Sequence, residues 1–198
     1  MSIRISKRSG LSGLAVGVVA VFGLLATPAL AQDILSKAVN DPATAWGTYG
    51  TLVKSELIKD AAVTGGVAER ITLTAKGANP WDAGAQTVTT KPLQKGDVLL
   101  LAFWAKAQEP PTGSDAIDLV AKLQEAAAPY VALSQDTPIR SGAQWKLYYV
   151  SGTAAKDYLP NTAGAALQLA TGEQVIDFGP VFILDFGPSY DVSKLPHN

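Results

Sequence analysis

The sequence predicts an all-β protein, built as a two-sheet antiparallel β-sandwich. Two observations support this fold class. Between Trp46 and Phe186, short stretches of alternating hydrophobic and polar residues are separated by Gly, Pro, Asn and Asp, which is how strands are spaced in sandwiches and barrels. In addition, residues 32–198 have the length of a single domain, and they contain neither an internal repeat nor a second domain.

Two strands are predicted from strict alternation, at residues 69–75 and 98–107. In the first, hydrophobic residues at odd positions alternate with Arg70 and two threonines, which is the pattern of a half-buried strand. In the second, one face is wholly hydrophobic, and the other carries Trp104 and Lys106. Because a lysine is rarely buried, that second face is predicted to point outward.

Residues 117–125 form the ambiguous segment, because they are rich in good helix formers. Hydrophobic residues at odd positions nevertheless alternate with polar ones, and only Val120 breaks the pattern. The segment is therefore predicted to be a strand. Further strands are predicted at 145–152, 165–170 and 175–184, the last with a bulge at Gly179 and Pro180.

The first 31 residues have the features of a secretory signal peptide. A basic start with Arg4, Lys7 and Arg8 precedes a hydrophobic stretch, and Ala29-Leu30-Ala31 supplies the small residues of a cleavage site. We therefore expect cleavage after Ala31, a periplasmic or extracellular protein, and no membrane association afterwards. The remaining segments are predicted as a lead-in (32–45), the sandwich domain (46–187) and a C-terminal tail (188–198).

Composition excludes several functions. Removing the three basic residues of the leader makes a chain of net charge −1 more acidic, so nucleic acid is not expected as a partner. The chain has no cysteine and its one histidine is His197 in the tail, so zinc sites made of His and Cys and nucleophile–histidine pairs are not expected. A chain of this length can bury enough surface to fold without disulfides.

Five segments, in this order, resemble a known family: NPWDAGAQ, KGDVLLLAFWAKA, QEAAAPY, GAQWKLYYVSG and QVIDFGPVFILDFG. Together they are similar to the jelly-roll carbohydrate-binding modules of the family 4, 9 and 22 type, in particular to the variant associated with bacterial glycan-degrading enzymes. The resemblance covers residues 40–187. It implies a galactose-binding-like jelly roll without catalytic activity, a polysaccharide or oligosaccharide ligand, and a glycan-degrading enzyme as a partner.

The resemblance also raises the question of calcium. Many members carry paired aspartates in the last strand, one of which helps to hold a structural calcium. This chain has Gly179-Pro180 there, with Asp177 and Asp185 displaced to either side. Because Ca²⁺ needs several oxygen ligands, this departure puts the calcium site in doubt, and no cofactor is expected.

A sugar ring is bound by a flat exposed aromatic side chain beside groups that form hydrogen bonds. Trp104 has outward parity, although it could instead pack under a loop. Trp81 lies between Pro80 and Asp82 in a predicted loop, where the alternative is a buried lid. Both tryptophans are candidate ligand-binding residues.

The candidate hydrogen-bonding residues are Gln86, Gln124, Gln168 and Arg70, each on the polar side of its strand. The alternative is a merely solvated face. Since consecutive jelly-roll strands often belong to opposite sheets, these side chains are not expected to share one groove.

We therefore expect a non-catalytic, secreted carbohydrate-binding domain. The first alternative is a structural or protein-interaction jelly roll that does not bind sugar. The second is a glycoside hydrolase that uses a pair of carboxylates, for which the sequence selects no pair.

Overall fold

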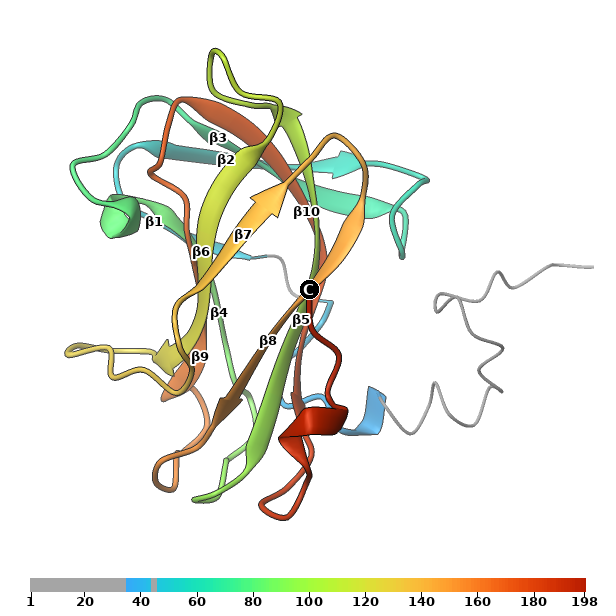
Figure 1. The fold of residues 1–198 in the computed structure, drawn as a ribbon, viewed down its shortest axis with the longest axis vertical. Helices are drawn as coiled ribbons and strands as arrows, with labels where there is room; N and C mark the ends of the chain where they lie inside the picture. Colours follow the sequence, from blue (N-terminus) through green and yellow to red (C-terminus); the bar gives the residue numbers. More distant parts are fainter. Residues whose placement is uncertain (1–34, 44–45) are drawn as a thin grey trace, which may run out of the picture.

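The computed structural model describes residues 35–43 and 46–198, and it is a sandwich of two antiparallel sheets (Figure 1). The predicted signal peptide, residues 1–31, lies outside the described residues. Each sheet has five strands, and the strand order shows the crossovers of a jelly roll rather than a simple meander. The all-β prediction is confirmed. Neither short 3-10 helix in the described part of the chain is long enough to cross a membrane.

Sheet I has the order β1-β4-β9-β6-β7 and sheet II the order β2-β3-β10-β5-β8. The strands of sheet I are β1 (Gly47–Tyr49), β4 (Gly84–Val88), β9 (Ala163–Gln168), β6 (Ile117–Glu125) and β7 (Thr137–Ser141). Those of sheet II are β2 (Val53–Lys59), β3 (Val67–Leu73), β10 (Gln174–Asp185), β5 (Val98–Glu109) and β8 (Lys146–Thr153). The two 3-10 helices are η1 (Pro80–Asp82) and η2 (Val192–Lys194).

Alternation predicted the strands well. The ambiguous segment 117–125 is strand β6, because its odd-numbered hydrophobic residues face the core. The bulge in β10 is confirmed by a register shift against β5 between Phe178 and Val181, on either side of Gly179 and Pro180. Strand β3 begins two residues before the predicted strand and ends at Leu73.

The core lies between the sheets and is centred on aromatic side chains. Phe103 and Phe178 are buried, and both contact Trp46, at ring-centroid distances of 6.0 and 5.7 Å. Trp46 immediately precedes β1, so its burial fixes where sheet I begins.

Both ends of the described chain pack on the outer face of sheet II, where Figure 1 shows the blue start and the red tail close together. They form a second, smaller hydrophobic cluster, which comprises Ala38, Val98, Leu100, Leu184 and Leu195. The start is also held by Asn40, whose side-chain amide donates to the Val181 carbonyl and accepts from the Ile183 N–H. The side chain of Asn198 pairs with the backbone of Tyr149 on the edge strand β8. Terminal segments therefore cover part of this face.

Leu195→Ala should destabilise the fold, because Leu195 is 5% exposed and closes the smaller cluster. We expect a loss of about 2 kcal/mol in the free energy of unfolding, the lower end of the range for a buried leucine. Urea unfolding measures it. The matched control is Val192→Ala in the same tail, because Val192 is 47% exposed and its loss should cost little. Equal stability of the two variants would contradict this packing.

Candidate functional site: the outer face of sheet I

Three of the predicted residues share one face. Gln86, Gln168 and Gln124 come from β4, β9 and β6, which are neighbours in sheet I. Gln168 is paired in register with Gly84 on one side and with Val120 on the other. Because the alternate residues of these strands belong to the core, all three glutamines project from the outer face. We call this surface the glutamine face.

Tyr49 covers part of the glutamine face. The phenol end of Tyr49 lies directly over Gly84, where a Cβ atom would stand 2.5 Å from the Tyr49 Oη. The phenol also donates to the Leu167 carbonyl, at 3.4 Å. A Cβ atom at position 84 would also clash with the Leu167 carbonyl, so glycine there allows both strand β9 and the Tyr49 phenol to approach closely.

Burial, together with the nearby Tyr130 phenol, raises the pKa of Tyr49 to about 12. Tyr49 therefore stays uncharged at physiological pH and can both donate and accept hydrogen bonds. Tyr130, in the loop between β6 and β7, is 54% exposed.

Trp81 is exposed at the same sheet, with 58% of its surface accessible. It lies in η1, which begins at a capping box between Asn79 and Asp82. The Ala170 N–H donates to the Pro80 carbonyl at 3.0 Å, which fixes η1 to the chain just after β9. The alternative of a buried lid therefore does not apply to Trp81.

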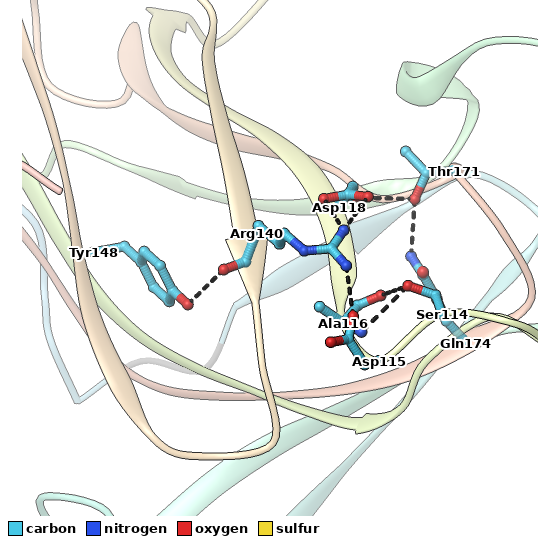
Figure 2. A network of polar contacts seen from close by, with 8 residues as sticks. All are labelled: Ser114, Asp115, Ala116, Asp118, Arg140, Tyr148, Thr171 and Gln174. Atoms are coloured by element: carbon cyan, nitrogen blue, oxygen red, sulfur yellow. Dashed lines mark hydrogen bonds and ion pairs between the residues drawn. The ribbon is translucent and has the colours of Figure 1, made fainter.

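One end of the glutamine face carries a network of ion pairs and hydrogen bonds (Figure 2). Nη1 of Arg140 in β7 donates to both oxygens of Asp118 at 3.1 and 3.0 Å, and Nη2 donates to Asp115 at 2.6 Å. The hydrogen bonds that Arg140 donates to Asp118 and then to Asp115 raise the pKa of Arg140. Thr171 donates to the Asp118 carbonyl at 2.7 Å, which ties the network to the turn after β9. All three charged side chains remain more than half exposed.

The chemistry of the glutamine face is that of hydrogen bonding without excess charge. Lys122, directly beside the central strand, is paired with Asp136 at 3.2 Å, and Arg140 is paired with two aspartates. Amides and phenols both donate and accept hydrogen bonds. Such a surface suits the hydroxyl groups of an uncharged ligand better than the charge of an anion.

Arg70 and Trp104 lie on the opposite side of the molecule, on the outer face of sheet II. Arg70 is directly opposite Asp177 in register, and Asp177 is opposite Lys106. The Arg70 guanidinium forks onto the Asp177 carboxylate at 2.8 and 3.0 Å, and Lys106 Nζ approaches it at 3.4 Å. The sequence expectation that the polar candidates do not all share one surface is thus correct for Arg70.

Trp104 is half-buried because the loop between β2 and β3 folds over it. Val63 of that loop is 5% exposed, and both Val63 and Trp104 press against Gly179 at the bulge of β10. Asp60 anchors the loop by accepting from Lys106 Nζ at 2.8 Å and from the Trp145 indole at 3.0 Å. The alternative prediction for Trp104, that it packs under a loop, therefore agrees with the structure.

Asp60→Asn should remove a pH-dependent part of the stability. Hydrogen bonds from Lys106, the Ala62 N–H and Trp145 lower the pKa of Asp60 to about 2. A carboxyl whose pKa is lower in the folded state stabilises the fold above its unfolded pKa of about 4, and this contribution is lost as pH falls towards about 2. In thermal unfolding, the Tm of the wild type should exceed the Tm of the variant near neutral pH, and the difference in Tm should shrink in acid. A difference that does not change with pH would contradict the anchor.

The aspartates that flank the β10 bulge are already occupied. Asp177 is held by Arg70, and Asp185 accepts from the Gly187 N–H at 2.8 Å. Burial, and the neighbouring Asp97, raise the pKa of Asp185. Within the part of the chain that the structure describes, no three metal-ligating side chains come together.

Sequence reasoning missed Tyr49 and the Arg140–Asp118 pair as parts of this surface. Strand parity could have found Asp118, which alternates with core residues in β6. Tyr49 carries no comparable signal, because β1 has three residues and shows no alternation.

Comparison with known proteins gives a structural likeness. No protein-family model matches the sequence, and no curated protein matches it. Among solved structures, the chain is similar to a family 4 carbohydrate-binding module (TM-score 0.52, 18% identity, 75% of this chain and 93% of that one). It is also similar to the CBM22-1 xylan-binding domain of Paenibacillus barcinonensis Xyn10C (TM-score 0.51, 13% identity, 76% and 92%).

A third similar structure is an arabinose-bound α-L-arabinofuranosidase, MgGH51 (TM-score 0.54, 14% identity, 75% of this chain). The chain spans 25% of the length of that enzyme. At such low identities, the likeness establishes a shared β-sandwich fold.

Proposed function

We propose that this protein is a non-catalytic, secreted glycan-binding module, which binds an uncharged polysaccharide or oligosaccharide on the glutamine face. The observation that carries the proposal is the gathering of Gln86, Gln124 and Gln168 on three adjacent strands beside Tyr49. The predicted signal peptide supports secretion. The fold shared with a xylan-binding domain supports the ligand class.

The residues of the glutamine face can be assigned different roles in binding a sugar. Tyr49, Tyr130 and Trp81 offer rings for the C–H surface of a pyranose, and the amides offer partners for its hydroxyl groups. Gln168 is 5% exposed and offers little surface to a ligand, whereas Gln86 is exposed and available for direct contact. Arg70 and Trp104 are engaged elsewhere and have no part in this proposal.

Affinity electrophoresis and isothermal titration against xylan, β-glucans, mannans and pectins test the proposal. We expect retardation and weak binding by at least one of the neutral polysaccharides, because one or two aromatic platforms supply only a few kcal/mol before association entropy is subtracted. Retardation by none of them would count against glycan binding and favour a protein-interaction role.

A hydrolase is less well supported. The carboxyl groups of Asp97 and Asp185 are neighbours, and burial together with Asp97 raises the pKa of Asp185. Hydrolytic pairs are held further apart, at about 5 to 9.5 Å, so that a sugar bond or a water molecule fits between them. Release of reducing sugar from polysaccharide would reverse this judgement. We also propose that residues 46–187 form the binding unit. The proposed partner is a glycan-degrading enzyme.

A further inference from the structure

The four edge strands of the two sheets differ in how they are protected against pairing with another strand. In sheet I, β1 has only three residues, and β7 contains Pro138, which has no N–H to donate. In sheet II, the side chain of Asn198 pairs with the N–H and the carbonyl of Tyr149 on β8. The other edge strand of sheet II, β2, has seven residues and no proline, and no second described strand pairs with it. Of these four edges, β2 is the one left open.

The backbone hydrogen bonds of β2 show which of its groups are free. The Thr74 N–H donates to the Leu52 carbonyl at 2.9 Å, and at the other end of the pairing the Asp60 N–H donates to the Gly66 carbonyl at 3.1 Å. Because hydrogen-bonded residues alternate along an antiparallel pair, the backbone groups of the even-numbered residues of β2 point towards β3. The odd-numbered residues point theirs towards the open edge. In the described chain, no backbone hydrogen bond is formed there by Val53, Ser55 or Leu57.

Four consecutive side chains of β2 are exposed, namely Lys54, Ser55, Glu56 and Leu57. Leu57 is 65% accessible, which is unusual for a leucine in a strand. Glu56 lies opposite Arg70 on β3, but the Arg70 guanidinium is held by Asp177. Within the described part of the chain, neither Lys54 nor Glu56 forms a salt bridge. One hydrophobic side chain and two opposite charges are therefore available to a partner.

The side chains of β2 complement a second copy of the same strand. When two copies run antiparallel about a two-fold axis at Ser55, Lys54 lies opposite the partner's Glu56, and Val53 lies opposite the partner's Leu57. The symmetry makes each of these pairs occur twice. A shift of two residues is the smallest that keeps the free backbone groups paired. In either direction, it would place Glu56 opposite the partner's Glu56 or Lys54 opposite the partner's Lys54, which is destabilising. Charge therefore selects one register.

We propose that two copies of this protein associate through β2, in an antiparallel pairing centred on Ser55 that joins the two copies of sheet II into one continuous sheet. The free backbone groups of Val53, Ser55 and Leu57 then find partners, and each exposed Leu57 packs against the partner's Val53. One pair of strands buries less than the roughly 1,200 Å² of a stable interface. The dimer is therefore weak, and it forms at micromolar concentrations or above.

Sedimentation velocity over a concentration series tests the proposal, because the wild type should pass from monomer to dimer as the concentration rises. Lys54→Glu and Glu56→Lys should each dimerise about 10-fold more weakly, since each places like charges opposite one another at two positions. An equimolar mixture of these two variants should dimerise at least as well as the wild type, because each supplies the charges that the other lacks. The control is Lys146→Glu, at an exposed lysine of the edge strand β8, which should dimerise as the wild type does.

A cysteine at the two-fold axis tests the register independently, because the chain has no cysteine of its own. In the proposed pairing, the Cα atoms of residue 55 in the two copies are about 5.5 Å apart, which a disulfide can span. On oxidation, Ser55→Cys should form a linked dimer about 10-fold faster than Ser151→Cys, whose serine is exposed on β8. A wild type that stays monomeric at millimolar concentration, a mixture of charge variants no more dimeric than either alone, or equal cross-linking of the two cysteine variants would each overturn the proposal.

Discussion

Replacing Tyr49 by alanine is expected to lower the affinity for glycan about 10-fold. A sugar that covers the exposed side of the Tyr49 ring removes roughly 100 Å² of hydrophobic surface from water, or about 2.5 kcal/mol before other costs are subtracted. The substitution also uncovers Gly84 and leaves the Leu167 carbonyl without the phenol. Isothermal titration with the best polysaccharide from the binding screen measures the loss.

Two control variants make the Tyr49 result specific. Tyr49→Phe keeps the ring and loses only a long hydrogen bond of 3.4 Å, so its affinity should stay close to that of the wild type. Trp104→Phe alters the opposite sheet and should not change the affinity. If Tyr49→Ala binds as well as the wild type, or Trp104→Phe abolishes binding, the ligand is not held by the glutamine face.

Asp177→Asn is expected to cost about 3 kcal/mol in the free energy of unfolding. Asp177 is fully buried and bridges Arg70 and Lys106, so removing its charge leaves Arg70 facing an uncharged amide and leaves Lys106 with Asp60 as its carboxylate partner. Breaking a buried pair by removing one partner typically costs about 3–5 kcal/mol, and partial exposure of Arg70 and Lys106 reduces this. Urea unfolding with a constant m-value would report the loss.

The protein offers a matched control for Asp177. Asp118 is also held by an arginine, because Nη1 of Arg140 donates to both of its oxygens at 3.1 and 3.0 Å, but it is 65% exposed. Asp118→Asn should therefore cost about 0–1 kcal/mol, because solvent screens an exposed pair. Similar losses of unfolding free energy for the two variants would show that burial does not decide how strongly these arginine–aspartate pairs stabilise the fold.

Much of the fold could be predicted because alternation is a local signal. Odd-numbered core residues identified β6 despite its helix-forming composition, and Gly179-Pro180 identified the bulge. The pairing of strands is not local. Nothing near Gln86 indicates that β4 lies next to β9, some 75 residues later, so the common face of the three glutamines could not be read from the sequence.

The same limit explains the other candidates. Arg70 and Trp104 had the correct outward parity, yet parity does not reveal what covers an outward face. In this protein the β2–β3 loop places Val63 against Trp104, and β10 places Asp177 beside Arg70. Burial of outward residues by a distant loop is a tertiary effect, and it separates an exposed Trp81 from a half-buried Trp104.

The most direct test of the central claim is an NMR titration of the labelled protein with a soluble neutral oligosaccharide drawn from the best polysaccharide. The account predicts saturable shifts of the side-chain amides of Gln86 and Gln124 and of the backbone around Tyr49, while the Trp104 indole resonance stays fixed. Shifts at Trp104 and along β5 and β10, with the glutamine amides unmoved, would contradict it.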